Sequence, residues 1–392
     1  MSARATIAVI HNRYRQAGGE DAVVAAHVAV LEDNGHRVVR FDASNDELAE
    51  MGALRQVTAT IWNRRASRDV QSFLAREKPR VAHFHNTFPL LSPAVYAAAR
   101  RAGVPVIQSL HNYRTICPNA LLFRDGAACE ECVAKRLKWP AVAHACYRNS
   151  RTASGITAGM LALHSMRGTW HSDVDAFVAL TTAARTRFVA GGLPADRIEV
   201  HPGFLAHDPG LGAHDGEFAL FVGRLSAEKG VATLLEAWRR VHRDGMTLRI
   251  VGSGPLDASL NRQLPGVEWL GECPNERVLA LMKAATFLVF PSECYEGFPV
   301  TLLEAFATGL PVLASNHGAM AEIVTHEATG LLFRPGEPDD LGVALQRAFE
   351  RPPSLSRVGA AGRLEFETKY TAAQAYNRLR GLYDALDRGV AA

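Results

Sequence analysis

Long apolar runs are missing from this sequence of 392 residues. No stretch approaches the roughly 18 consecutive apolar residues that a membrane-spanning helix needs, and the opening MSARATIAVIHN leads into a strand pattern without the hydrophobic core of a signal peptide. Cysteine is scarce as well, and six cysteines inside a cell are more often thiols or metal ligands than disulfides. These absences predict a cytoplasmic protein, with peripheral contact at the inner face of the membrane left open.

A large charge of one sign is missing too. The formal net charge is +3, and 21% charged with 48% hydrophobic residues is an ordinary globular composition. The balance falls short of the basic signature of nucleic-acid-binding proteins, so we expect no nucleic-acid partner. A mildly basic protein suits a phosphate-bearing ligand or an anionic membrane surface. The length predicts two or three domains.

Short apolar strands alternate with helical patterns along both halves of the chain. This alternation predicts α/β domains, each with a doubly wound parallel sheet. The two runs meet at HPGFLAHDPGLGAHDGE, where glycine, proline and aspartate replace the periodic pattern. We therefore predict an N-terminal domain over 1–205, a linker over 206–217, a second domain over 218–370, and a C-terminal helix over 371–392 that could cross back to the first domain.

One stretch of the second half, FPSECYEGFPVTLLEAFATGLPVLAS (290–315), places a helix between two apolar strands. Pro299 marks the first turn of this helix and Gly309 its end. Because the helix opens directly after a strand, its first amides form an anion site past the strand's carboxyl end. The residues that supply these amides are Val300, Thr301 and Leu302.

Two glutamates of this stretch are expected to face the same crevice. The carboxylate of Glu304, one turn into the helix, can accept hydrogen bonds from two neighbouring hydroxyls, as a ribose offers. Glu296, on the loop before the helix, is placed for a sugar hydroxyl on the other side of the phosphates. The alternative is that Glu304 is an exposed helix residue and Glu296 a solvated loop charge.

Two more turns follow apolar strands in the second half. GRLSAEKG (223–230) carries Arg224, whose guanidinium can grip two phosphate oxygens, and Lys229, which adds a mobile charge. A solvated basic loop is the alternative. VGSGP (251–255) reads as a strand-to-helix turn in which two glycines allow close approach of a ligand, although the GxGxxG spacing of a dinucleotide site is absent.

In this order and spacing, GRLSAEKG, VGSGP and PSECYEGFPVTLLEAFATGLPVLAS resemble the nucleotide-binding domain of glycosyltransferase family 4, over nearly all of 218–350. The resemblance implies a retaining enzyme of the GT-B fold, with two facing Rossmann-like domains, one cleft between them, and a helical C-terminus. It also implies Arg224 and Lys229 on the donor diphosphate, Glu304 on the ribose, and Glu296 near the transferred sugar.

The N-terminal half is less diagnostic. QAGGE (16–20) follows the first strand and opens a helix, so Gly18 and Gly19 can bring amides against a phosphate or an acceptor, or can simply form a tight turn. His111 ends the strand VPVIQSL and matches a family histidine that faces the donor sugar, where a neutral imidazole could donate a hydrogen bond. His83 and His85 alternate on one strand and share a face, and His85 could line the cleft.

The insertion 113–150 interrupts the alternation and contains four cysteines, two of them in a CxxC pair. Four thiolates around a zinc ion would hold such a loop without an apolar core, whereas inert thiols or a redox pair are the alternatives. The expected metal ligands are Cys117, Cys129, Cys132 and Cys146. The resemblance extends, less generally, to relatives with an insertion of this kind after the histidine.

A basic and aromatic run lies in and just after this insertion. Its members are Lys135, Arg136, Lys138, Trp139, Tyr147, Arg148 and Arg151. The run could meet a membrane surface or a lipid diphosphate, or could be an ordinary solvated face. The nearby SDVD, with Asp173 and Asp175, looks like the metal-binding DxD of another glycosyltransferase architecture, but it opens a strand at the end away from the cleft, so we reject it.

The sequence thus predicts a retaining glycosyltransferase that moves a sugar from a UDP- or GDP-sugar donor to a glycan, lipid-linked or small-molecule acceptor. No cofactor is expected beyond a possible structural zinc. Expected catalytic residues are His111, Glu296, Arg224 and Lys229, and expected donor-binding residues are Gly18, Gly19, Gly223, Arg224, Lys229, Gly252, Gly254, Glu296, Gly297, Phe298, Val300, Thr301, Leu302 and Glu304. The rivals are a sugar-nucleotide epimerase or hydrolase of the same fold, a pyridoxal-phosphate phosphorylase, and a nucleic-acid module that uses the cysteines.

Overall fold

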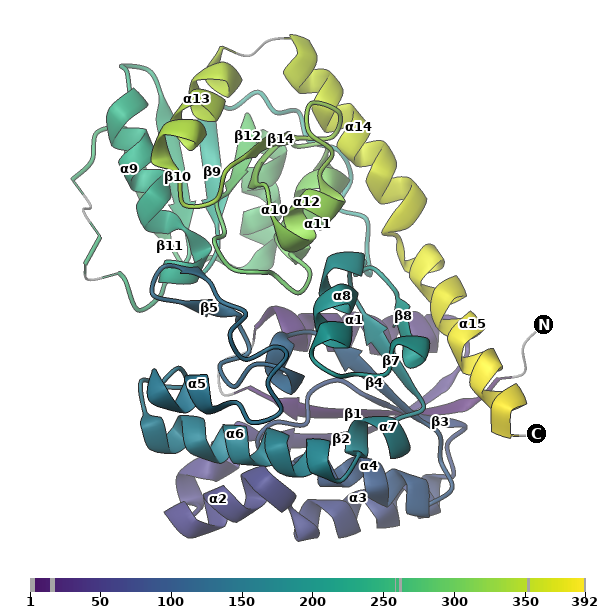
Figure 1. Cartoon of the computed structure of the whole chain (residues 1–392). Helices are drawn as coiled ribbons and strands as arrows, with labels where there is room; N and C mark the ends of the chain where they lie inside the picture. The colour runs from purple at the N-terminus through teal and green to yellow at the C-terminus, as the bar shows by residue number, and fades with distance from the viewer. Residues whose placement is uncertain (1–3, 15–17, 258, 261–262, 351–352, 391–392) are drawn as a thin grey trace. The chain divides into compact units, whose positions relative to one another are not determined.

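The computed structural model describes residues 4–14, 18–257, 259–260, 263–350 and 353–390. The chain folds as two compact units (Figure 1). The first unit comprises Met1–Leu122, Glu130–Ala206 and Ala372–Ala392, and the second comprises Phe123–Cys129 and His207–Thr371. None of the helices in the described ranges is long and apolar enough to cross a membrane.

The first unit is built on a six-stranded parallel sheet with the strand order β2-β1-β3-β4-β7-β8. The strands are β1 (Thr6–Arg13), β2 (Arg37–Ser44), β3 (Val81–Phe84), β4 (Val106–Leu110), β7 (Ala176–Ala179) and β8 (Ile198–Val200). Ile7 of β1 pairs with Val38 on one side and Val81 on the other. Central strands of such a sheet are covered on both faces, which is why Ile7 to Ile10 are an unbroken apolar and fully buried run.

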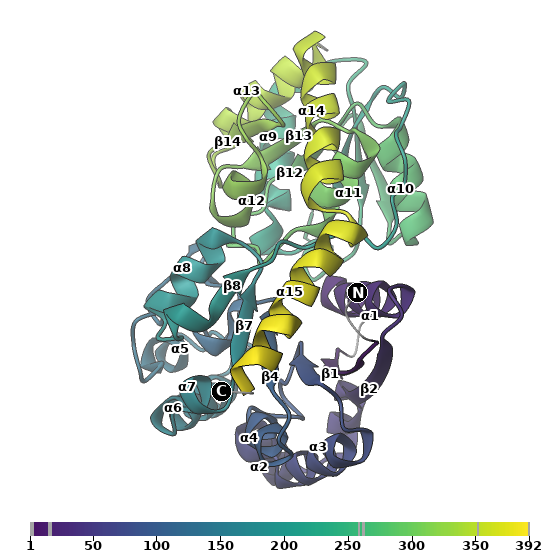
Figure 2. The same cartoon turned by 90° about the vertical axis from the view of Figure 1, so that its right-hand side faces the viewer.

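Helices cover the first sheet. They are α1 (Gly19–Asp33), η1 (Asn45–Glu50), α2 (Ala53–Trp62), α3 (Arg64–Glu77), α4 (Ala94–Arg101), η2 (Tyr113–Thr115), α5 (Trp139–Ala143), α6 (Arg151–Met166), α7 (Thr169–Ser172), α8 (Thr182–Ala190), η3 (Ala195–Arg197) and α15 (Ala372–Val390). The last helix, α15, lies along this sheet, and its Leu379, Leu382 and Tyr383 join the same apolar core as Ile7 and Val9 (Figure 2).

The second unit has its own six-stranded parallel sheet, in the order β11-β10-β9-β12-β13-β14. Its strands are β9 (Phe218–Val222), β10 (Thr247–Val251), β11 (Val267–Gly271), β12 (Phe287–Phe290), β13 (Val312–Ser315) and β14 (Leu331–Phe333). Its helices are η4 (Ala227–Lys229), α9 (Val231–Val241), α10 (Asn275–Ala284), α11 (Val300–Thr308), α12 (Gly318–Ile323), α13 (Pro338–Phe349) and α14 (Pro353–Lys369). A short hairpin, β5 (Phe123–Arg124) with β6 (Ala127–Ala128), also belongs to it.

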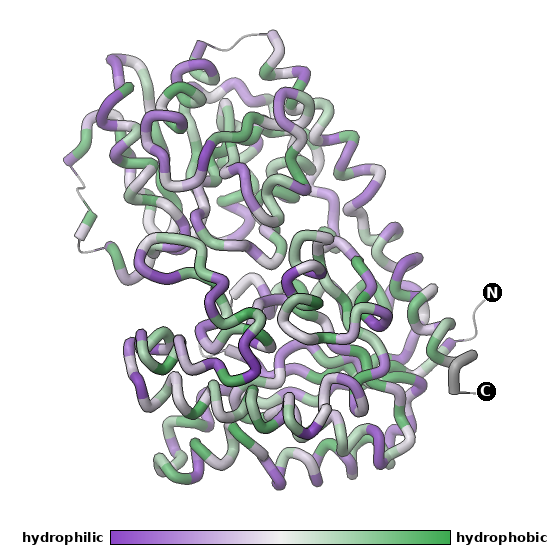
Figure 3. The backbone as a smooth tube through the Cα atoms, in the orientation of Figure 1, coloured by the Kyte–Doolittle hydropathy of each residue, from purple (hydrophilic) through white to green (hydrophobic). Residues whose placement is uncertain are grey.

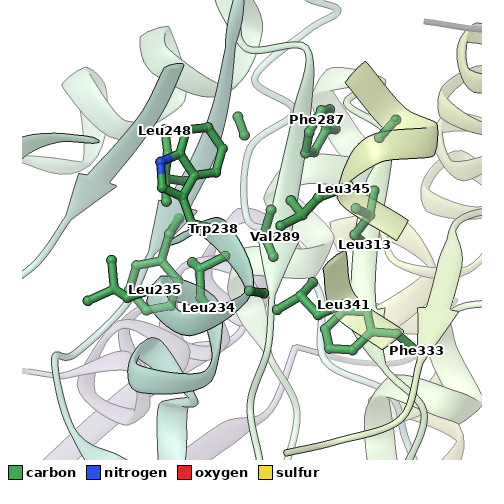
Figure 4. Close-up of a cluster of buried hydrophobic side chains, with 14 of the residues drawn as sticks. Leu234, Leu235, Trp238, Leu248, Phe287, Val289, Leu313, Phe333, Leu341 and Leu345 are labelled. Atoms are coloured by element: carbon green, nitrogen blue, oxygen red, sulfur yellow. The ribbon is translucent and has the colours of Figure 1, made fainter. Parts of the chain in front are cut away.

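The core of the second unit packs α9 and α13 against one face of this sheet (Figure 4). Trp238 is fully buried there among Leu248, Phe287 and Leu345, and its indole N–H donates to the carbonyl of Pro265 at 2.9 Å. Hydrophobic and hydrophilic residues alternate along α14 and α15 (Figure 3), as expected of helices with one buried face. The prediction of a wholly helical C-terminus is confirmed.

One local prediction was wrong. We expected a helix after VGSGP, between β10 and β11, but no helix occurs there in the described residues 252–257, 259–260 and 263–266. The segment runs through turns instead, and Leu256 N donates to the carbonyl of Leu225 at 3.0 Å. Its apolar residues Leu256, Leu260 and Leu264 pack on the core without helical structure.

Candidate functional site

The strand order of the second unit reverses between β9 and β12, which makes the carboxyl ends of these two strands the expected ligand site of a doubly wound sheet. The segment after β9 contains Gly223, Arg224 and Lys229, and the segment after β12 contains Glu296. Residues that are 67 positions apart in sequence therefore meet at one edge of the sheet.

Lys229 and Glu296 form an ion pair at this edge. Lys229 Nζ donates to Glu296 Oε1 at 2.6 Å, and the buried Ser292 hydroxyl donates to the same oxygen at 2.5 Å. Burial alone would lower the pKa of Lys229, but the Glu296 carboxylate beside it raises that pKa overall. The lysine is thus held as a cation. The sequence did not predict this pairing of Glu296 with Lys229.

Arg224 is held through its guanidinium group but is largely exposed. Its Nη2 donates to Glu228 Oε1 at 2.5 Å and its Nε to Ser226 Oγ at 3.4 Å, yet 60% of its side chain is exposed. Ser226 also donates to Glu228 Oε1 at 2.7 Å. Ser226 and Glu228 were not predicted. In the sequence they are a hydroxyl and a carboxylate between two cationic residues of one loop, a pattern that is equally typical of solvent-exposed polar residues.

The glycines of the two loops allow backbone to pack on backbone. A Cβ at Gly252, where φ is +138°, would overlap the carbonyl oxygen of Gly223, and a Cβ at Gly254 would lie 2.7 Å from the amide nitrogen of Leu225. Likewise, Gly230 in the left-handed region (φ +67°) presses against Pro291 of the loop after β12. These glycines therefore allow the close backbone packing that holds the loop carrying Arg224 in place, and this role does not depend on a bound ligand.

The helix α11 begins and ends where the sequence predicted, with Pro299 as its N-cap and Gly309 as its left-handed C-cap (φ +75°). One predicted amide is already used, because Leu302 N donates to the carbonyl of Pro299 at 3.0 Å and the Leu302 side chain is fully buried. Val300 and Thr301 remain the predicted donors to an anion. Phe298 packs near Tyr370, with ring centroids 6.0 Å apart.

Glu304 projects from the middle of α11 into a half-buried position. Burial raises the pKa of this carboxyl from the ordinary 4.5 to about 7, although a hydrogen bond from Asn275 on α10 acts in the opposite direction. An exposed helix glutamate would not behave in this way. The side chain is therefore held where burial disfavours its charged form, and about half of the Glu304 carboxyl groups are ionised near pH 7.

In the first unit, six side chains form one hydrogen-bonded chain, which we call the histidine network: Ser109, His83, Tyr383, His27, His85 and His111. They come from four elements far apart in sequence, namely α1, β3 and its end, β4 and its end, and α15. His111 lies at the carboxyl end of β4, as predicted, and is half-buried. His83 and His85 share a face, with rings stacked 4.8 Å apart. His27 and Tyr383 were not predicted, because no motif or spacing marks them.

Tyr14 and Glu20, near the start of α1, hydrogen-bond Asn112, the residue after His111. Gly18 is the N-cap of α1, and its amide donates to Asp21 Oδ2 at 3.0 Å. Among the described residues, chain neighbours apart, nothing lies within 4 Å of a Cβ placed on Gly18 or Gly19. The other two residues of the QAG segment, 16–17, lie outside the described residues. Burial raises the pKa of Glu20 to about 7, while Tyr14 and Asn112 donate to its Oε2 at 3.0 and 3.2 Å.

Models of known protein families match nearly the whole chain. One, described as a glycosyl transferase 4-like domain, matches residues 4–203, just over half of the chain, and another, glycosyl transferases group 1, matches residues 207–365. The chain belongs to this glycosyltransferase family.

Curated relatives and solved structures agree with this assignment. The amylovoran biosynthesis glycosyltransferase AmsK of Erwinia amylovora is 29% identical over 218 residues, which span 51% of this chain and about half (54%) of that protein. The Anabaena protein Alr3699/HepE, solved with UDP, has a TM-score of 0.69 at 16% identity, over 96% of this chain and 99% of HepE. Sucrose-phosphate synthase of Thermosynechococcus elongatus reaches 0.73 at 18% identity, over 98% and 100%. These likenesses confirm two Rossmann-like domains of GT-B type.

The cysteines do not form a three-ligand group anywhere in the described part of the chain. Cys132 is buried and interacts electrostatically with Cys117 and Cys146, and burial raises its pKa to about 11. Cys117 Sγ donates to Asn119 Oδ1 at 2.8 Å, whereas Cys129 belongs to the second unit. The four-thiolate zinc site stays a prediction.

The basic and aromatic run is not one solvated face. Lys138 is buried and its ammonium donates to the carbonyls of Cys132 and Val133 at 2.9 and 3.1 Å, a structural role. Trp139 and Leu137, by contrast, are about 60% exposed. The rejected DxD aspartate Asp175 lies at the amino end of β7, where it accepts from the amide of Val106 at 2.8 Å and pairs with Arg100 at 2.6 Å.

Proposed function

We propose that this protein transfers a glycosyl residue from a nucleoside-diphosphate sugar to an acceptor hydroxyl, with retention of the anomeric configuration. The observation that carries the proposal is the meeting of Arg224, Lys229 and Glu296 at the strand-order reversal of the second unit, beside the N-terminus of α11. Such an edge can bind a diphosphate between two cations and helix amides.

Catalysis is then mainly electrostatic. As the bond between sugar and diphosphate breaks, negative charge grows on the departing phosphate, and Arg224 and Lys229 stabilise it. The acceptor hydroxyl attacks on the same face and passes its proton to the leaving phosphate oxygen, which gives retention. Glu296 hydrogen-bonds the sugar and orients Lys229, Glu304 accepts from the ribose hydroxyls, and His111 donates to the sugar or the leaving group.

A UDP- or GDP-sugar is the proposed donor, and the likeness to HepE, which was solved with UDP, supports testing UDP-sugars first. The proposed acceptor is a glycan or a lipid-linked sugar. A hollow of about 710 Å³ in the first unit, beside the end of β2 and lined by Phe41, Met51 and Trp62, offers room for it. Exposed Leu137 and Trp139 support a peripheral contact with a lipid surface. A structural zinc on the four cysteines also belongs to the proposal.

The test is the release of nucleoside diphosphate from a panel of UDP- and GDP-sugars, with and without oligosaccharide acceptors. We expect one donor to be consumed, slowly alone and faster with an acceptor. Arg224→Ala should lower the rate about 100-fold or more, and Arg239→Ala, which removes an exposed arginine paired with Glu236 on α9, should leave it unchanged. Equal rates in the two variants would contradict the proposal.

A further inference from the structure

The histidine network allows only two arrangements of its protons. The distances are 2.8 Å for Ser109 Oγ to His83 Nε2, 2.9 Å for His83 Nδ1 to Tyr383 Oη, 3.0 Å for Tyr383 Oη to His27 Nε2, 2.8 Å for His27 Nδ1 to His85 Nε2, and 2.7 Å for His85 Nδ1 to His111 Nε2. Each distance is that of a hydrogen bond, which needs one proton and one lone pair. The histidine network therefore has five hydrogen bonds, called links below.

The six groups carry one proton each. Burial lowers the pKa of His27 to about 4 and that of His111 to about 3, and lowers those of His83 and His85 well below the usual range, so every ring is neutral near pH 7 and has one N–H. The inner groups always place their proton in a link. Because six protons serve five links, the spare proton must point outward from one end, either from Ser109 or from Nδ1 of His111.

The Ser109 end decides between these arrangements. Ser109 is 5% exposed, and within the described residues its hydroxyl is hydrogen-bonded to His83 alone. A hydroxyl proton pointing away from His83 would have no protein acceptor among the described residues, at a cost comparable to a lost hydrogen bond. The Ser109 proton therefore belongs in the link to His83. All the other protons then follow in one direction, and the spare proton lies on Nδ1 of His111.

A shared metal ion does not explain the cluster. His27, His83 and His85 each offer a nitrogen within 4.8 Å of the others. However, His27 meets His85 through Nδ1 and meets Tyr383 through Nε2, and these two nitrogens point to opposite sides of the ring. The stacked rings of His83 and His85, 10° from parallel, do not converge on one point either. Both ring nitrogens of His27, and both of His85, are already used in hydrogen bonds within the network.

We propose that Tyr383, on the C-terminal helix α15, is a positioning residue that holds His111 as the tautomer with its proton on Nδ1. Tyr383 is the one hydroxyl in the middle of the histidine network. It accepts a hydrogen bond from His83 and donates one to His27, so the direction of hydrogen bonding that Ser109 sets continues to His111. The outward Nδ1–H is then a ready donor to an oxygen of the sugar or the leaving diphosphate. This last step rests on the proposed function.

The matched control lies on the same helix. Tyr376 also hydrogen-bonds a histidine, His36 Nε2, at 3.0 Å, but His36 has no link to His111 among the described residues. Tyr383→Phe and Tyr376→Phe thus each remove one hydroxyl from α15; the first removes two tyrosine–histidine hydrogen bonds and the second removes one. Only Tyr383→Phe interrupts the network.

The experiment measures the ring ¹⁵N shifts of protein labelled in histidine, with His111→Gln used to assign the His111 signals. We expect the wild type and Tyr376→Phe to show His111 protonated at Nδ1, and Tyr383→Phe to show a mixture of tautomers. The turnover number should fall about tenfold in Tyr383→Phe, the scale of one hydrogen bond, with the KM for the donor changed less, and should be kept in Tyr376→Phe.

Protonation at Nε2 in the wild type, which needs no folded variant to observe, would overturn the proposal. So would an unchanged His111 tautomer in Tyr383→Phe, or equal loss of turnover in both tyrosine variants. A metal ion that is present at one per chain and lost in His27→Gln would overturn it as well. The tautomer measurement needs no substrate, so a wild type that turns over no donor would refute the proposed function and leave the network to be judged by its ¹⁵N spectrum.

Discussion

Replacing Glu304 by glutamine should make the protein more stable and its donor binding weaker. The pKa of Glu304 is raised from 4.5 to about 7 by burial. At about 1.4 kcal/mol per pH unit, ionising this buried group costs about 3 kcal/mol of the free energy of unfolding. Glutamine keeps the shape and can still accept from Asn275, but it cannot ionise.

The stability of the wild type should fall as the pH rises, because the unfolded chain loses the Glu304 proton at a lower pH than the folded chain does. As the pH rises from 4.5 to 7, the unfolded chain has lost the Glu304 proton while the folded chain retains it, so the wild type becomes less stable through this window and stays so above it. The variant lacks this loss. We expect equal unfolding midpoints at pH 4 and a gain of up to about 3 kcal/mol for Glu304→Gln at pH 8, measured by thermal and urea unfolding.

Binding should change in the opposite direction. A carboxylate that accepts from ribose hydroxyls contributes about 1.5–3 kcal/mol, so calorimetric titration of UDP and GDP at pH 8 should show affinity reduced about 10- to 150-fold in Glu304→Gln. Glu276→Gln, at an exposed position on α10, is the control and should change neither property. Loss of stability in Glu304→Gln, or unchanged nucleotide affinity, would refute the reasoning.

Four further predictions follow from the same geometry. Lys229→Ala should lower the rate of nucleoside diphosphate release about 100-fold, because the leaving charge loses a cation and Glu296 loses its partner; a loss below tenfold would contradict this. Gly252→Ala should lower the unfolding midpoint, since its Cβ would overlap backbone, and an unchanged midpoint would refute the packing argument. Transfer should proceed in excess EDTA, as Arg224 and Lys229 supply the positive charge; immediate loss that magnesium reverses would count against it. Elemental analysis should find near one zinc per chain, reduced in Cys129→Ser, and protein without zinc would end that proposal.

Much of the second unit could be predicted from the sequence, because its signals are local. The apolar runs 286–290 and 310–315 specify buried parallel strands, and Pro299 and Gly309 mark the ends of the helix between them. The cations after β9 and the glutamate after β12 are brought together by the sheet order alone. What the sequence did not show is the pairing at the edge, since nothing local distinguishes a Lys229–Glu296 ion pair from two separate ligand contacts.

The first unit shows the limit of local reasoning more clearly. The histidine network joins His27 to Tyr383 across 356 residues, and that contact exists only because α15 packs against the first sheet. A buried histidine on α1 and a tyrosine on a terminal helix carry no periodic or motif signal. The positions of His85 and His111 at strand ends could be predicted from the sequence. The hydrogen bonds that decide which nitrogen of His111 holds the proton depend on tertiary packing.

The most direct test of the central claim is to follow an α-linked UDP-sugar and an α-linked GDP-sugar by proton NMR during turnover with an oligosaccharide acceptor. We predict that the donor anomeric signal disappears while a new α-configured glycoside appears and nucleoside diphosphate accumulates, and that Arg224→Ala slows all three changes about 100-fold or more. A β-configured product, an isomerised sugar nucleotide, or donors that stay intact with every acceptor would contradict the account.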